Sequence, residues 1–116
     1  MIVGIGTDLC VIERFGAMLR RRPGIAERIL TSGERALPVQ SQAARFAAKE
    51  ALAKALGSPG GMSWLDVEVV RSEAGAPSFV VTGTVAERVA ELGVTRIHLS
   101  VSHDGGFATA TVVCEA

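Results

Sequence analysis

The segment over residues 42–56, which contains the run RFAAKEALAKA, constrains the fold of this chain more than any other. At about 100° per residue, Arg45 and Lys49 fall on the helix side that carries two leucines, whereas Glu50 and Lys54 point elsewhere. The remaining surface is mostly alanine, which lets a neighbouring element approach closely. We therefore predict an alanine-rich helix that packs tightly and holds charged side chains in a cleft.

The composition fits one soluble domain spanning residues 1–116. The chain is 48% hydrophobic, but no stretch approaches the roughly 20 apolar residues of a membrane span, and no basic leader precedes the first strand. Cys10 and Cys114 lie in apolar runs without the spacing of a metal or redox pair. We expect reduced core cysteines, a cytoplasmic location and no membrane partner.

Charge is unevenly distributed although the total is zero. Residues 1–58 contain nine basic and five acidic side chains, a net charge of +4, and residues 59–116 carry the balancing −4. The three arginines at 20–22 indicate either a solvated helix end or a surface for an anionic partner. The neutral total, the absence of tyrosine and the single tryptophan disfavour a nucleic acid partner.

The order of the predicted elements favours an α+β fold. Two predicted hairpins disfavour a parallel sheet, so we expect a mostly antiparallel sheet packed against the long alanine-rich helix and shorter helices. A capping box at Thr31 and Glu34 predicts an additional helical turn. The predicted strands cover 2–9, 64–72, 78–82, 96–102 and 107–114, and the predicted helices cover 12–21, 26–30, 42–56 and 84–92.

Two carboxylates from separate elements suit a metal site. Asp8 ends the first predicted strand, a position typical both of site residues and of helix N-caps. Glu50 and Lys54 form an i,i+4 pair, which on an exposed helix contributes only about 0.2–0.5 kcal/mol. If Asp8 and Glu50 meet, they suit Mg²⁺, which takes one or two protein carboxylates together with water and phosphate. Basic residues of the same helix would then bind phosphate.

The sequence Ser102-His103-Asp104 is not a catalytic triad, because neighbours on a strand point to opposite faces. His103 shares parity with apolar strand residues, so it is either a satisfied core histidine or a site residue at the sheet edge. Asp104 is typical of the start of a hairpin turn. No H-E-x-x-H motif, P-loop or complete dinucleotide fingerprint occurs, so those enzyme classes are weakly supported.

Several motifs taken together resemble the holo-(acyl carrier protein) synthase family, the small phosphopantetheinyl transferases. The matches run in family order along nearly the whole chain. They are GIGTDL at 4–9, AERILT at 26–31, RFAAKEA at 45–51 with Lys54, the Gly75-x-Pro77 motif and HLSVSH at 98–103.

The resemblance implies a reaction and a metal site. This family transfers the 4′-phosphopantetheine arm of coenzyme A to a serine of an apo acyl carrier protein and releases adenosine 3′,5′-bisphosphate. By that resemblance, Asp8 and Glu50 are Mg²⁺ ligands, and Lys54 neutralises charge on the phosphates as the P–O bond breaks. Either Glu50 or a metal-bound water takes the serine proton.

The resemblance also implies binding residues and an assembly. The family is trimeric with sites at subunit interfaces, and Pro77 matches a position beside the adenine that a neighbouring subunit contributes. Other matched positions line the coenzyme A pocket, namely Arg45, Lys49, Lys54, Gly57 and His103, and His103 is also expected to be catalytic together with Glu50 and Lys54. Those that match the surface for the acidic helix of the carrier are Arg14, Met18 and Arg28.

Two features depart from the family pattern. Asp104 follows His103 where some relatives have an uncharged residue, so it adds either a third carboxylate near the site or a turn cap. The segment between Glu34 and Arg45 is shorter than in some relatives, which leaves open whether fatty acid carriers, polyketide carriers or both are served. The alternative functions are a non-catalytic carrier-binding module and another Mg²⁺-dependent nucleotide phosphotransferase.

Overall fold

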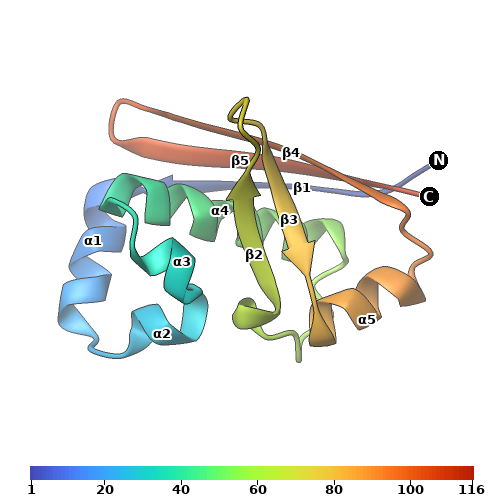
Figure 1. The fold of residues 1–116 in the computed structure, drawn as a ribbon, viewed down its shortest axis with the longest axis horizontal. Coiled ribbons are helices and arrows are strands. Elements are labelled where there is room, and N and C mark those ends of the chain that lie inside the picture. Colours follow the sequence, from blue (N-terminus) through green and yellow to red (C-terminus); the bar gives the residue numbers. More distant parts are fainter.

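The computed structural model describes all 116 residues and contains two antiparallel sheets (Figure 1). In the larger sheet, β5 (Phe107–Glu115) lies between β1 (Ile2–Val11) and β4 (Arg96–Asp104). The strands β2 (Val67–Arg71) and β3 (Pro77–Val81) pair with each other alone. The predicted α+β class is confirmed, whereas the division into two sheets was not predicted from the sequence.

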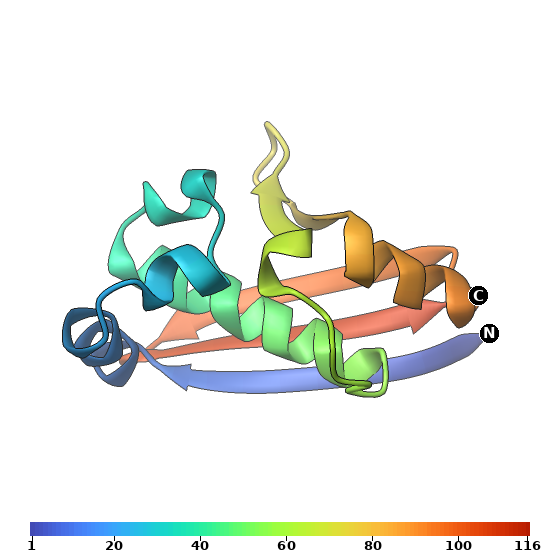
Figure 2. The ribbon, with the colours of Figure 1, turned by 90° about the horizontal axis from the view of Figure 1, so that it is seen from below.

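The longest helix, α4, crosses one face of the three-stranded sheet, and the β2–β3 ribbon lies beyond it on the same side (Figure 2). Shorter helices pack around α4, and none of the helices is long and apolar enough to cross a membrane. The helical elements are α1 (Ile12–Arg21), α2 (Ile25–Ile29), α3 (Ser32–Arg35), α4 (Val39–Ala55), the 3₁₀ turn η1 (Trp64–Asp66) and α5 (Gly83–Glu91).

The contact between α4 and β1 depends on small residues. A Cβ atom added at Gly4 would overlap the carbonyl oxygen of Ala55, and one added at Gly6 would overlap that of Ala51. Only glycine lets the helix backbone come this close to the strand. The predicted tight packing of the alanine-rich segment is therefore seen, and β1 supplies the complementary glycines.

Local sequence signals placed most elements within a few residues. The predicted capping box is present. The Thr31 hydroxyl accepts a hydrogen bond from the Glu34 N–H, and the Glu34 carboxylate accepts one from the Thr31 N–H. Helix α4 begins at Val39, three residues before the predicted start, with Pro38 at the N-cap position. Residues 64–66 form a 3₁₀ turn rather than the predicted strand.

The two faces of the three-stranded sheet differ sharply. The face toward α4 buries alternate residues of β5, including Val112 and Cys114, which are both fully buried. On the other face Ile5, Leu9 and Phe107 are 66%, 59% and 44% exposed, and we call these three residues the open sheet face. Both cysteines are free, as predicted for reduced thiols, although Cys10 is only half-buried.

Candidate functional site

Asp8 lies on the side of β1 that faces α4, where it meets Lys54. The Lys54 ammonium donates to Asp8 Oδ1 at 3.1 Å and to the backbone oxygen of Thr7 at 2.9 Å. Lys54 therefore bonds across to β1 instead of pairing with Glu50 along the helix. The N-cap of α1 is Val11, so the alternative interpretation of Asp8 as a helix cap is wrong.

Glu50 is half-buried beside these two residues and makes no hydrogen bond within the chain. Burial, and then the nearby Asp8 carboxylate, raise the pKa of Glu50, while Lys54 acts in the opposite direction. Two carboxylates that repel each other are a typical cation-binding pair. No group of three or more metal-ligating side chains occurs in the chain, so a cation held here would take most of its ligands from water or substrate.

A basic groove of about 530 Å³ opens directly onto Asp8. It contains Arg14 and Met18 from the predicted carrier surface, together with Arg21 and Arg22. Arg28 lies in a neighbouring hollow of about 520 Å³ that shares Arg22 with the groove. The structure thus places Arg14 and Met18 beside Asp8, whereas Arg28 lines the neighbouring hollow.

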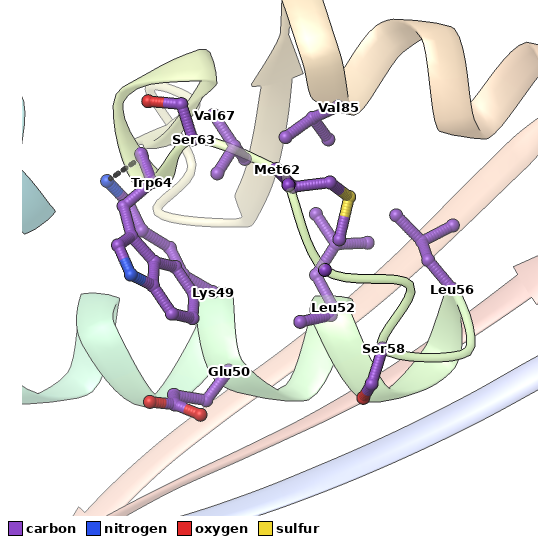
Figure 3. A pocket seen from close by; sticks show the side chains of 13 residues that line it. Lys49, Glu50, Leu52, Leu56, Ser58, Met62, Ser63, Trp64, Val67 and Val85 are labelled. Carbon is purple, nitrogen blue, oxygen red and sulfur yellow. Dashed lines mark hydrogen bonds between the residues drawn. The ribbon is translucent and has the colours of Figure 1, made fainter.

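A second opening, a cavity of about 290 Å³, is lined in part by Glu50 (Figure 3). Its apolar wall is formed by side chains that converge from α4, the following loop, β2 and α5, namely Leu52, Leu56, Met62, Val67 and Val85. Trp64 and Ser58 also line it. Sequence reasoning missed these residues, although the single tryptophan and the glycine-rich loop after α4 were available signals.

The Lys49 ammonium is fully hydrogen-bonded within the chain. Its three donors bond to Glu34 Oε1 at 2.7 Å, Ile29 O at 2.9 Å and Trp64 O at 3.0 Å. The side chain is 0% exposed. Burial lowers the pKa of Lys49, and the Glu34 carboxylate opposes that shift. All three donors of Lys49 are thus used within the chain, while the residue also lines the cavity beside Glu50, and a contact of Lys49 with coenzyme A stays a prediction.

Arg45 lies on the leucine side of α4, as the helical periodicity predicted, and is 8% exposed. Its Nη1 donates to Ser41 O at 3.4 Å, and its buried Nε has no partner in the chain. Burial and the nearby Arg71 lower the pKa of Arg45. A role for Arg45 in binding coenzyme A stays a prediction.

His103 and Pro77 lie away from the Asp8–Glu50 region of the same chain. His103 is exposed, so the core-histidine interpretation is wrong, and it lines a separate hollow with Asp104 and Gln40. The Asp104 side chain makes no hydrogen bond at the turn. Pro77 is the first residue of β3, and Gly57 has φ +85° directly after α4, as expected of a helix stop.

Known proteins share both the sequence and this arrangement. A family model described as the 4′-phosphopantetheinyl transferase superfamily matches residues 4–112. The holo-[acyl-carrier-protein] synthase of Clavibacter michiganensis subsp. michiganensis is 60% identical over 115 residues, covering 99% of this chain and 97% of that protein. The solved synthase of Neisseria meningitidis is 34% identical, with a TM-score of 0.91 and 100% coverage of both chains. That of Helicobacter pylori, in complex with coenzyme A, is 33% identical with a TM-score of 0.84, covering 96% of this chain and 99% of its own.

Proposed function

The chain belongs to the 4′-phosphopantetheinyl transferase superfamily, and from this premise we propose how its residues carry out the transfer. The enzyme moves the 4′-phosphopantetheine group of coenzyme A to a serine of an apo acyl carrier protein and releases adenosine 3′,5′-bisphosphate. The observation that carries the assignment of the site is the position of three charged residues between two openings. Asp8 lines the basic groove, Glu50 lines the apolar cavity, and Lys54 bonds to Asp8.

Mg²⁺ is the proposed cofactor, with Asp8 and Glu50 as its protein ligands. The donor set fits, because two carboxylates without a third protein ligand leave room for water and phosphate oxygens, which Mg²⁺ prefers. When bound, the ion would neutralise charge on the pyrophosphate of coenzyme A.

Lys54 and Glu50 have separate roles in the proposed transfer. The Lys54 side chain is 50% exposed, so its ammonium is able to turn from Asp8 to a phosphate oxygen and stabilise the charge of the leaving group. Glu50 takes the proton of the carrier serine, since its carboxylate has no hydrogen-bond partner in the chain and lies beside the cavity.

The carrier protein docks on the basic groove in this proposal. Arg14 and Arg28 are exposed and Met18 is half-buried, so the surface offers two cations and an apolar contact to an acidic helix. Fatty acid carriers are the proposed partners, with polyketide carriers as further candidates. The cytoplasm, where coenzyme A and apo carriers are present, is the proposed place of action.

The arm of coenzyme A fits the cavity beside Glu50. The arm alternates apolar segments with amides, and the cavity combines an apolar wall with the loop that follows Gly57. Backbone N–H groups of Gly60 and Gly61 have no partner within the chain and are available to amide oxygens. Arg45, with its unpartnered buried Nε, is the proposed additional contact for coenzyme A.

A homotrimer would complete the site. His103 and Pro77 lie apart from Glu50 in one chain, so a second copy has to supply them if they contact coenzyme A. The open sheet face is apolar and uncovered, as expected of a surface between subunits. Sedimentation should therefore give a trimer, and Leu9→Lys should shift the protein to monomers with loss of transfer. A monomeric wild-type enzyme that is fully active would refute this assembly.

Intact mass spectrometry tests the reaction itself. Purified protein, coenzyme A, Mg²⁺ and an apo carrier should add one phosphopantetheine to the carrier serine, and Asp8→Asn should abolish the gain. A non-catalytic carrier-binding module would bind the carrier without any mass change. For another nucleotide phosphotransferase, calorimetry with Mg²⁺ would show ATP binding at least as tightly as coenzyme A.

A further inference from the structure

Glu34 and Lys49 form the only fully buried ion pair of the molecule, and the proposed transfer does not use it. Their side chains are 1% and 0% exposed and are joined at 2.7 Å. The remaining carboxylate bonds are also made, since Glu34 Oε1 accepts the Thr31 N–H at 2.8 Å and Glu34 Oε2 accepts the Val69 N–H at 2.9 Å. Every polar atom of the pair is thus satisfied within the fold.

The partners of this pair belong to four different segments. Lys49 itself is on α4, and it holds the last residue of α2, Ile29, and the first residue of η1, Trp64. Glu34 holds its own capping box at Thr31 and the middle of β2 at Val69. The pair therefore connects α4 to α2, α3, η1 and β2 at one point.

The segments joined in this way are too short to keep their places alone. Helices α2 and α3 have five and four residues, and η1 has three, far below the roughly 12 residues at which isolated helices become marginally stable. Yet α2 carries Arg28, beside the carrier groove, and η1 carries Trp64, which lines the cavity. Asp8 and Glu50 lie instead on β1 and α4, two long elements that pack closely against each other.

We propose that Glu34 and Lys49 are positioning residues of the transfer reaction, which hold the carrier-binding turn at Arg28 and the cavity wall at Trp64 in register with Glu50. The proposal rests on the proposed function. Lys49 precedes Glu50 on α4, so the point of attachment lies directly beside the reacting groups. Small displacements of groups that orient a substrate are costly even when the reacting groups stay in place.

Steady-state kinetics of the double variant Glu34→Gln/Lys49→Met test this role. The double variant removes both charges together and leaves no unpaired buried ion. We expect the KM for the apo carrier to rise about tenfold or more, with kcat at saturating substrates within about threefold of the wild type. A merely structural role would lower the folded fraction, which reduces apparent kcat and leaves KM unchanged.

Arg28→Ala supplies a second readout. In the wild type it should raise the carrier KM, whereas in the double variant it should have little further effect, because Arg28 is no longer held at the groove. Glu91→Gln is the matched control: it breaks a surface ion pair, Arg88–Glu91 at 3.2 Å, and should leave both kinetic constants unchanged. If the double variant does not fold, Glu34→Asp serves, since it keeps both charges of the pair and withdraws the carboxylate by one methylene from Lys49 and Val69.

An unchanged carrier KM in a folded variant would overturn the proposal, whether kcat falls or not. Full additivity with Arg28→Ala would do the same. Failure of the proposed function is distinguishable, because in that case the wild type and Glu91→Gln would also transfer nothing.

Discussion

Helix α4 makes two lysine–carboxylate contacts little more than one turn apart, and they differ in every physical respect. Lys49 and Glu34 lie 2.7 Å apart with side chains 0% and 1% exposed, and all their hydrogen-bonding groups are used. Lys54 and Asp8 lie 3.1 Å apart with side chains 50% and 21% exposed. Beside them Glu50 has no partner. A fully satisfied buried pair is typical of a structural role, whereas incompletely satisfied charges at an opening are typical of functional sites.

Replacing Glu50 should have the largest effect on activity. Glu50→Gln removes both a proposed metal ligand and the proposed base, so transfer should fall by about a thousandfold. Thermal stability at neutral pH should stay the same or rise, because the raised pKa means that ionised Glu50 is unfavourable in the folded state. Mass-spectrometric rates and a melting curve measure the two effects. An unaltered transfer rate would show that Glu50 is not a residue of the active site.

Replacing Lys49 should mainly lower the stability of the fold, whereas replacing Glu50 should mainly lower activity. Lys49→Met leaves the Glu34 carboxylate buried without its cation, which should cost about 3–5 kcal/mol of unfolding free energy. Adding Glu34→Gln should recover part of this loss. Urea unfolding measures both free energies. A loss of unfolding free energy below about 1 kcal/mol would show that the Lys49–Glu34 pair behaves like an exposed ion pair.

The close approach of α4 to β1 determines the distance between Asp8 and Glu50. The hydrogen bonds of Lys49 do not affect this distance directly, because they join α4 to α2, α3 and η1. Gly6→Ala forces a Cβ into the carbonyl oxygen of Ala51, so it should cost about 3 kcal/mol and separate the two carboxylates. Gly60→Ala is the control. An added Cβ there meets nothing within 4 Å, so only its positive φ is penalised, by about 1–2 kcal/mol. Equal losses for both variants would contradict the packing argument.

The smallest expected effect is a shift in the titration of Glu50. Because burial and Asp8 raise its pKa, the midpoint in metal-free protein should lie above the ordinary glutamate value of about 4.3. Carboxyl-carbon NMR measures the midpoint, and Asp8→Asn should lower it by removing one of the two causes. A midpoint at or below the ordinary value would show that the carboxylates do not interact.

Local patterns located most of the fold, and a motif match supplied the proposed metal ligands. Periodicity identified α1, α4 and α5 within a few residues, and the capping box at Thr31 and Glu34 is present because both partners lie within one helical turn. The motif match identified Asp8 and Glu50 before their side chains could be placed. These features depend on residues that are close together in the sequence, so sequence patterns are sufficient to predict them.

Only the tertiary structure decided the partner of each lysine. Lys54 was expected to pair with Glu50 or phosphate but bonds to Asp8, 46 residues away, and Lys49 was expected at the phosphates but is buried against Glu34, 15 residues away. The same helix periodicity is compatible with either outcome. Which cation is enclosed and which stays open depends on where α2, η1 and β2 pack against α4, and that is set by long-range contacts that no local pattern encodes.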